Sequence, residues 1–274
     1  MKSTTIGERA QFASIALLVA EEAGAFVSAG YRTRPQADTK GQRTDLVTEY
    51  DRASESVLCA RLASLAPGVP IVAEEAAVNV SLAERQGLVW YVDPLDGTTN
   101  FVHGHPFWSI SVGLFDADEP IAGAVVAPAL NLRWSGWVGE PGARPGEARR
   151  NGKRCTVSPT PHLEQALVAT GFPADRTMAP ANNFHSFMSV KHVARGVRRC
   201  GSAAIDLCMV ADGTYDGYWE RKLSIWDVAA GSAIVLAGGG QVTALDGGTP
   251  RYHVGHIVAS NTLVHTELVE AINA

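Results

Sequence analysis

The chain of 274 residues carries 23 Lys and Arg against 28 Asp and Glu, which gives a net charge of −5, and 46% of its residues are hydrophobic. This length suffices for one large domain or two small ones with a substantial core, and the composition is that of an ordinary globular protein. The basic residues are scattered, and the densest runs, at 149–154 and 198–199, are short enough to be solvated loops, which argues against nucleic acid as a partner.

The N-terminal segment and the cysteines together bear on location. The apolar segment 12–30 is interrupted by Glu21 and Glu22, so the sequence predicts neither a leader peptide nor a membrane span. The cysteines have no Cys-x-x-Cys pair and no metal-ligand spacing, and we expect buried, reduced thiols. They are Cys59, Cys155, Cys200 and Cys208. These features predict a reducing, cytoplasmic compartment.

The first half of the chain predicts helices followed by strands, from the spacing of its apolar residues and from its turn residues. The expected elements are a helix over 8–28, a polar loop at 33–43, a second helix with an apolar stripe from Val47 to Leu65, buried strands at 69–73 and 88–92, and an antiparallel meander at 108–138. This half is therefore of the α+β type.

The second half alternates strands and helices. Strands are expected at 166–172, 196–200, 216–220, 240–245 and 256–260, and helices near 180–194, 202–212, 226–238 and 262–273. The Gly- and Pro-rich segment 139–150 is the best linker candidate. We therefore expect an α+β half over 1–145 and an α/β half over 146–274, stacked in layers as one integrated unit.

The decapeptide VDPLDGTTNF (92–101) ends an apolar strand with charged and hydroxyl side chains. Buried carboxylates need compensation, and a hard divalent cation provides it by collecting carboxylate and carbonyl oxygens. A bend at Gly97 can aim Asp93, the Leu95 carbonyl and Asp96 at one point, with the backbone N–H groups of 97–99 exposed to a phosphate. Asp-Pro and Asp-Gly are also ordinary turn sequences, so the decapeptide alone leaves both interpretations open.

Four further acids occupy strand or helix ends. Glu74 follows the strand at 69–73, Asp51 fits a capping box with Thr48, and Glu220 and Asp227 end a strand and begin a helix. Each has a plain structural alternative, namely surface charge, the capping box, or the N-cap of a helix for Asp227. Together with the decapeptide, these acids favour a shared metal site in a chain that is only 19% charged.

Several segments, in this order and across essentially the whole chain, resemble the inositol monophosphatase family. They are DLVTEYD (45–51), IVAEE (71–75), WYVDPLDGTTNFVHGHPFWSISVGL (90–114), RCGSAAIDLCMVADGTYDGYWE (199–220) and WDVAAGSAIVLAGG (226–239). The resemblance implies a layered α/β/α/β/α phosphatase that uses Mg²⁺, is inhibited by lithium and is usually a homodimer.

The resemblance also implies roles for individual residues. The ligands of two or three Mg²⁺ ions would be Glu74, Asp93, the Leu95 carbonyl, Asp96 and Asp227, with Asp93 bridging. Thr98 and Asp51 would orient and deprotonate the attacking water, with Glu74 also catalytic. The N–H groups of Gly97, Thr98 and Thr99 would meet the phosphate, and Ser202, Ala203 and Glu220 would meet the alcohol. Asp96 and Gly201 would also belong to the substrate-binding set. Lys40 matches a family lysine near the site.

Two segments depart from the family pattern. Residues 223–227 read LSIWD, where bacterial members commonly have a proline before the tryptophan, and residues 131–137 read NLRWSGW, where members often have an acid and smaller residues. Neither departure removes an implied ligand. We expect the second segment to serve packing or dimer contacts.

The expected activity is Mg²⁺-dependent hydrolysis of a small phosphate monoester, inositol 1-phosphate first, by a metal-activated water without a phosphoenzyme. The alternative is a histidinol-phosphate phosphatase or another sugar or nucleotide phosphatase of the same family. A non-enzyme alternative is a partner for macromolecules with secondary phosphatase activity. A haloacid-dehalogenase-type enzyme is disfavoured because its D-x-D-G-T motif is one residue shorter than Asp93-Pro-Leu-Asp96-Gly-Thr.

Overall fold

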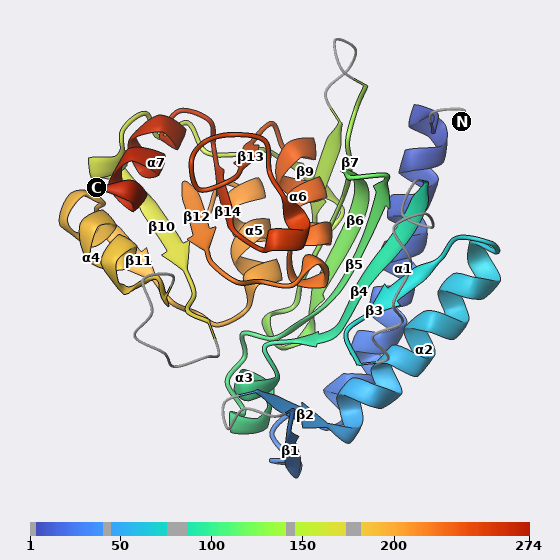
Figure 1. Cartoon of the computed structure of the whole chain (residues 1–274). Helices are drawn as coiled ribbons and strands as arrows, with labels where there is room; N and C mark the ends of the chain where they lie inside the picture. The colour runs from blue at the N-terminus through green and yellow to red at the C-terminus, as the bar shows by residue number, and fades with distance from the viewer. Residues whose placement is uncertain (1–3, 41–44, 76–86, 141–145, 174–181) are drawn as a thin grey trace.

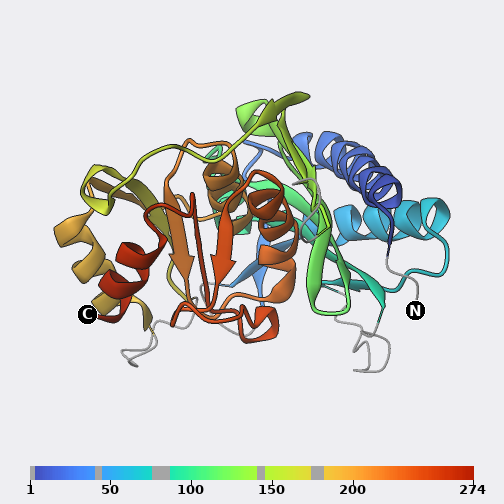
Figure 2. The same ribbon diagram turned by 90° about the horizontal axis from the view of Figure 1, so that it is seen from above.

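The computed structural model describes residues 4–40, 45–75, 87–140, 146–173 and 182–274, which form layers of helices and sheets (Figure 1). Seen from above, α1 and α2 cover one face of a seven-stranded sheet, α5 and α6 lie between that sheet and a five-stranded sheet, and α4 and α7 cover the far side (Figure 2). This arrangement confirms the predicted α/β/α/β/α layering.

The two N-terminal helices begin at capping boxes. Helix α1 (Ile6–Ser28) is capped by Thr5, and α2 (Glu49–Leu65) is capped by Thr48 with Asp51 at its third position, as the sequence predicted. Between them, the prediction of a loop at 33–43 was wrong in part, because β1 (Ala37–Thr39) pairs antiparallel with β2 (Leu46–Thr48). Strands of three residues are too short to show an alternating pattern.

The seven-stranded sheet has the order β3-β4-β5-β6-β7-β8-β9, with β3 parallel to β4 and every other pair antiparallel. The strands are β3 (Ile71–Ala73), β4 (Leu88–Asp96), β5 (Ser109–Asp116), β6 (Glu119–Ala127), β7 (Leu132–Trp137), β8 (Glu147–Arg150) and β9 (Lys153–Cys155). The predicted meander is therefore confirmed.

The hairpin of β8 and β9 corrects two predictions. Residues 141–145 of the predicted linker lie outside the described residues, but 147–150 form a strand that continues the first sheet beyond position 145. The basic run 149–154, expected to be a solvated loop, forms most of this edge hairpin. Charged residues are common on edge strands because they hinder pairing with another chain. A run of charged residues is also typical of a loop, and the sequence alone therefore did not indicate the strands.

The five-stranded sheet has the order β11-β10-β12-β14-β13, with β10 parallel to β11 and β12 and the remaining pairs antiparallel. The strands are β10 (Leu167–Thr170), β11 (Gly196–Arg198), β12 (Gly217–Glu220), β13 (Gln241–Thr243) and β14 (Ile257–Ser260). The helices of the second half are α4 (Phe184–Val193), α5 (Ala203–Ala211), α6 (Ile225–Ala237) and α7 (His265–Asn273). All nine elements lie at predicted positions.

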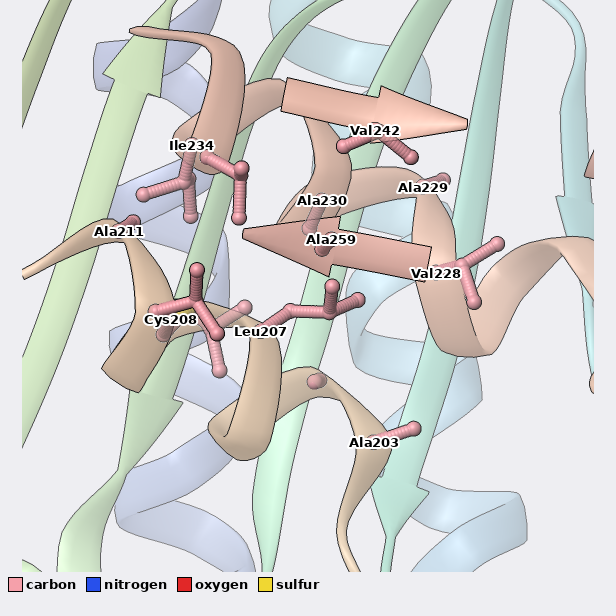
Figure 3. Close-up of a cluster of buried hydrophobic side chains, with 14 of the residues drawn as sticks. Ala203, Leu207, Cys208, Ala211, Val228, Ala229, Ala230, Ile234, Val242 and Ala259 are labelled. Carbon is pink, nitrogen blue, oxygen red and sulfur yellow. The ribbon is translucent and has the colours of Figure 1, made fainter. Parts of the chain in front are cut away.

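Small residues let α5 and α6 lie close to both sheets. Ala229 and Ala230 of α6 are fully buried, in a cluster that also includes side chains from α5, β13 and β14 (Figure 3). The same two alanines lie against Gly113 and Gly123, which are paired across β5 and β6. A Cβ atom built on Gly123 would lie 2.7 Å from the Ala230 Cα, so the helix rests directly on the strand backbone.

Two sequence-based expectations about exposure need qualification. Helix α1 is long and apolar enough to cross a membrane by length and composition, but a core helix of a folded protein meets the same criterion, and α1 packs on the seven-stranded sheet. All four cysteines are free, as predicted, but only Cys208 is fully buried.

In the divergent segment 131–137, Trp134 is buried and its Nε1 donates to Asp212 Oδ2 at 2.8 Å, which agrees with a packing role.

Gly123→Ala is expected to destabilise the fold by about 1–3 kcal/mol, because the added methyl meets helix backbone that must shift. Urea unfolding measures the change. Gly7→Ala is the matched control, since nothing lies within 4 Å of its added methyl. Equal stabilities of the two variants would contradict the close packing of α6 on β6.

Candidate active site

Two parallel strands bring the first acids together. Ala73 of β3 is in register with Val92 of β4, and the backbone N–H of Glu74 donates to the Val92 carbonyl at 3.2 Å. Glu74 and Asp93 therefore leave neighbouring strands at the same edge, as the sequence predicted. Asp93 is 2% exposed, and its carboxyl group hydrogen-bonds with that of Glu74.

The turn after Asp93 is shaped by backbone contacts. The Leu95 N–H donates to Asp93 Oδ1 at 2.9 Å, and the pairing of β4 with β5 shifts register between Asp93 and Asp96. Gly97 then adopts a left-handed conformation with φ of 88° and precedes α3 (Thr98–His103). A Cβ atom on Gly97 would lie 2.8 Å from the Phe107 carbonyl oxygen, so this bend requires glycine.

Asp96 connects the two halves of the molecule. Its Oδ2 accepts hydrogen bonds from Ser202 Oγ at 2.6 Å and from the Ala204 N–H at 2.9 Å, at the start of α5. Nearby, the Asn100 amide donates to the carbonyls of Cys200 and Gly201. These contacts place the 201–203 segment beside the decapeptide, although about 100 residues separate them in sequence.

Asp227 holds the start of α6. Its Oδ2 accepts from the Ser224 N–H at 2.7 Å, and Ser224 is the N-cap of the helix. The alternative in which Asp227 is itself the N-cap was wrong, because the helix begins two residues earlier, at Ile225. Ile225 occupies the first helical position, where the family proline commonly lies, and the capping box holds Asp227 without that proline.

Asp51 and Thr98 form the pair implied by the resemblance. Thr98 Oγ1 lies 2.9 Å from Asp51 Oδ1 and 3.0 Å from the Leu95 carbonyl oxygen, and its single proton can serve one of them at a time. The other Asp51 oxygen accepts from the Thr48 N–H and hydroxyl at 2.8 and 2.6 Å. Capping thus fixes the carboxyl group that faces Thr98.

Helix α2 also supports both acidic turns. Ser54 is fully buried and donates to the Pro94 carbonyl at 2.8 Å, between Asp93 and Leu95. Glu55 accepts the Glu75 N–H at 2.7 Å, directly after Glu74. We did not single out these two residues from the sequence, since the only signal there is their position on the same helix as Asp51, three and four residues later.

These residues surround a cavity of about 570 Å³ between the two halves. The predicted residues that line it are Glu74, Asp93, Leu95, Asp96, Gly97, Thr98, Thr99, Gly201, Ser202, Ala203, Glu220 and Asp227. Asp51 lies behind Thr98 and reaches the cavity through it. Lys40 lies beside the site, as expected, and pairs with Glu74 at 2.8 Å and also with Glu75.

Burial and mutual repulsion raise the pKa of the clustered acids. Desolvation raises the pKa of Asp93 well above its usual range, and the charges of Glu74, Asp96 and Asp227 raise it further. Burial raises the pKa of Asp227 similarly and that of Asp96 to about 6, against the hydrogen bonds from Ser202 and Ala204. The cluster is therefore held at an electrostatic cost in the absence of a cation.

The donor set fits a hard divalent cation by its chemistry. Among the described residues, no Lys, Arg or His forms an ion pair with Asp93, Asp96 or Asp227. In the part of the chain that the structure describes, no three His, Cys, Asp or Glu side chains are grouped so that they could hold a metal ion as they lie, and Glu74 is paired with Lys40. The fit is therefore one of ligand type. Carboxylate and backbone carbonyl oxygens are the ligands that Mg²⁺ prefers.

Two further buried acids of the second half, Glu220 and Asp206, line the cavity. Burial raises the pKa of Glu220 to about 7, with an opposing effect from the hydroxyl of Tyr218, which hydrogen-bonds to it, and from Arg199. Asp206, one turn into α5, is 1% exposed, and its Oδ1 has no partner among the described residues. Asp206 and Arg199 line the cavity and were missed, although both lie inside the quoted segment 199–220.

The layered fold and the acidic cleft define a class of metal-dependent phosphatases, and comparisons with known proteins agree. The sequence model of the Inositol monophosphatase family matches residues 8–274. The Inositol-1-monophosphatase of Synechocystis sp. is 39% identical over 92% of this chain and 85% of that protein. The Nus factor SuhB of Pseudomonas aeruginosa is 35% identical over 94% of each chain. The solved inositol monophosphatase of Anabaena (Nostoc) superimposes with a TM-score of 0.83 at 36% identity, covering 96% of this chain and 95% of that one.

The chain therefore belongs to the inositol monophosphatase family and is a phosphoric monoester hydrolase.

Glu220→Gln is expected to flatten the pH dependence of stability. Because folding raises the pKa of Glu220 from 4.5 to about 7, the folded chain holds this proton more tightly than the unfolded chain. Stability should therefore fall as pH rises from about 4.5 to about 7, and the glutamine variant should fall less. Urea unfolding across this window in the presence of a chelator measures it. Glu164→Gln, on the exposed surface, should follow the parent chain, and a parallel curve for Glu220→Gln would refute the assignment.

Ser54→Ala leaves the buried Pro94 carbonyl without its donor and should cost about 1–3 kcal/mol of stability, with a loss of phosphatase turnover as the turn relaxes. Urea unfolding and steady-state kinetics measure both effects. Ser56→Ala is the control on the same helix, because its hydroxyl lies on the exposed face and donates to the Arg52 carbonyl at 2.9 Å. If the two variants behave alike, Ser54 does not support the site.

Proposed function

We propose that the protein hydrolyses a small phosphate monoester in a Mg²⁺-dependent reaction, with inositol 1-phosphate as its leading substrate. The observation that carries the proposal is the convergence of Glu74, Asp93, Asp96 and Asp227 on one cavity, beside the Thr98–Asp51 pair. Bound there, Mg²⁺ would neutralise charge on the phosphoryl group and the leaving alkoxide and would make water more acidic.

The start of α3 would hold the phosphate. The first N–H groups of a helix have no partner within it. Gly97 forms the left-handed bend, and Thr98 and Thr99 are the first two residues of α3 after it. Positive dipole ends and exposed N–H groups attract anionic oxygens. The decapeptide therefore brings phosphate donors and metal ligands into a segment of seven residues, 93–99.

Thr98 and Asp51 would orient the attacking water. When the Thr98 hydroxyl donates to Asp51 Oδ1, its oxygen is left to accept a hydrogen bond from water. Burial raises the pKa of Asp51, while the contacts from Thr48 and Thr98 lower it, so this carboxyl group can take up a proton through Thr98. The attack is direct, and no aspartyl phosphate forms.

Glu220 would recognise the leaving alcohol. Its carboxyl group lines the same cavity as the acidic turns, Ser202 and Ala203, and suits an alcohol with several hydroxyl donors. This favours a phosphorylated polyol over other family substrates, with histidinol phosphate as the next candidate. From the family we also propose a cytoplasmic homodimer that lithium inhibits.

A second candidate is a role as a partner of macromolecules. It is favoured by the 35% identity to a relative named Nus factor SuhB over 94% of both chains. In that case a variant that no longer hydrolyses phosphate esters would still bind its macromolecular partner. The presence of all four acids of the proposed metal site at the cavity favours catalysis as the first function.

Asp96→Asn is expected to lower hydrolysis of inositol 1-phosphate by several orders of magnitude while the fold persists, because it removes a carboxylate from the proposed ligand set. Phosphate release with Mg²⁺ and with chelator, together with thermal unfolding, measures this. Asp118→Asn, whose side chain is 82% exposed, is the control. Hydrolysis that survives both the chelator and Asp96→Asn would overturn the mechanism and favour the binding role.

A substrate panel and an isotope experiment complete this test. Higher kcat/KM for inositol 1-phosphate than for histidinol phosphate, fructose 1,6-bisphosphate or 3′-phosphoadenosine 5′-phosphate is expected. Single-turnover hydrolysis in ¹⁸O-labelled water should place the label in phosphate without a trapped acyl phosphate. A trapped aspartyl phosphate would exclude direct attack.

A further inference from the structure

An aromatic pair borders the catalytic cavity and has no role in the chemistry described above. Phe172, just after β10, and Phe184, at the start of α4, both line the cavity, with ring centroids 4.9 Å apart. Phe187 packs behind Phe172 at 5.7 Å. Phe184 is nevertheless 51% exposed, so part of a large apolar surface remains in contact with solvent at the entrance.

Buried hydrogen bonds fix the position of this pair. Asn183 is 1% exposed, and its amide nitrogen donates to Thr170 Oγ1 at 2.8 Å and to the Gly171 carbonyl at 2.6 Å. Its amide oxygen accepts from Trp219 Nε1 at 2.8 Å. One side chain thus ties the end of β10, the start of α4 and β12 together, and the aromatic rings are carried on fixed backbone.

The same contacts place the rings beside the alcohol-binding carboxyl group. Trp219 immediately precedes Glu220. A Cβ atom built on Gly171 would lie 2.1 Å from Glu220 Oε1, so the carboxyl group lies against the backbone that leads into Phe172. A hydrogen-bonding group and an apolar wall therefore adjoin one another at one end of the cavity.

Resting on the proposed function, we propose that Phe172 and Phe184 form a second recognition surface for the leaving alcohol. The substrates it favours are phosphate monoesters whose alcohol carries both a hydroxyl group for Glu220 and a flat or apolar ring. Covering the exposed face of Phe184 removes apolar surface from water, and a ring can stack on it in an offset or edge-on geometry. A compact alcohol gains neither contribution.

A matched pair of esters tests this wall. The 3-O-phenyl and 3-O-methyl ethers of glycerol 1-phosphate share the phosphate and the free hydroxyl, and they differ in the ring. The parent protein should show a kcat/KM about tenfold higher for the phenyl ether, and Phe184→Ala should abolish that preference by lowering kcat/KM for the phenyl ether. Phe184→Leu should give an intermediate preference, since it keeps apolar surface without a ring.

Met188→Ala is the matched control, because Met188 lies on the same helix, is 55% exposed and does not line the cavity. Its preference should equal that of the parent. Equal kcat/KM for the two ethers in the parent, or an unchanged preference in Phe184→Ala, would refute the aromatic recognition surface. Hydrolysis of inositol 1-phosphate would in that case still support the proposed function. Failure to hydrolyse inositol 1-phosphate and both ethers in the presence of Mg²⁺ would overturn the proposed function itself.

Discussion

The main constraint on this structure is that the fold brings several carboxylates close together, where their negative charges repel one another. Burial raises the pKa of Asp93, and the charges of Glu74, Asp96 and Asp227 raise it further. Such a cluster weakens the folded state by itself, so it persists only where the surrounding backbone holds it and a cation can offset the charge. The remaining architecture supplies those supports.

Three of the acids at or beside the cavity also form hydrogen bonds at the start of a helix. Asp51 caps α2 and faces Thr98, Asp227 occupies the capping box of α6, and Asp96 accepts the N–H of Ala204 at the start of α5. Helix N-termini stabilise negative charge, so three acids rest where the helix dipoles favour them. The capping interpretation and the functional interpretation of these residues are therefore compatible, because the cap provides the geometry that the chemistry needs.

The sequence predicted those parts of the site that lie in continuous motifs or at the ends of strongly apolar strands. Glu74 and Asp93 are examples, because β3 and β4 are short apolar runs whose carboxyl ends meet. It did not reveal Ser54 and Asn183, whose partners are Pro94 and Trp219, 40 and 36 residues away in sequence. A polar residue in a helix pattern gives no sign of a distant partner. The β8–β9 hairpin was missed for a different reason, since its charged edge imitates a loop.

The two ends of the cavity are anchored differently, and this difference bears on specificity. The decapeptide, which carries the proposed phosphate site, is joined to the second half by contacts of Asp96 and Asn100 with the 200–204 segment. The alcohol end is built within the second half, where Asn183 positions the start of α4. A substitution at Phe184 alters the surface offered to the alcohol without touching a proposed metal ligand. Under the proposed roles, the range of alcohols would therefore change at Phe184 while the proposed metal ligands are preserved.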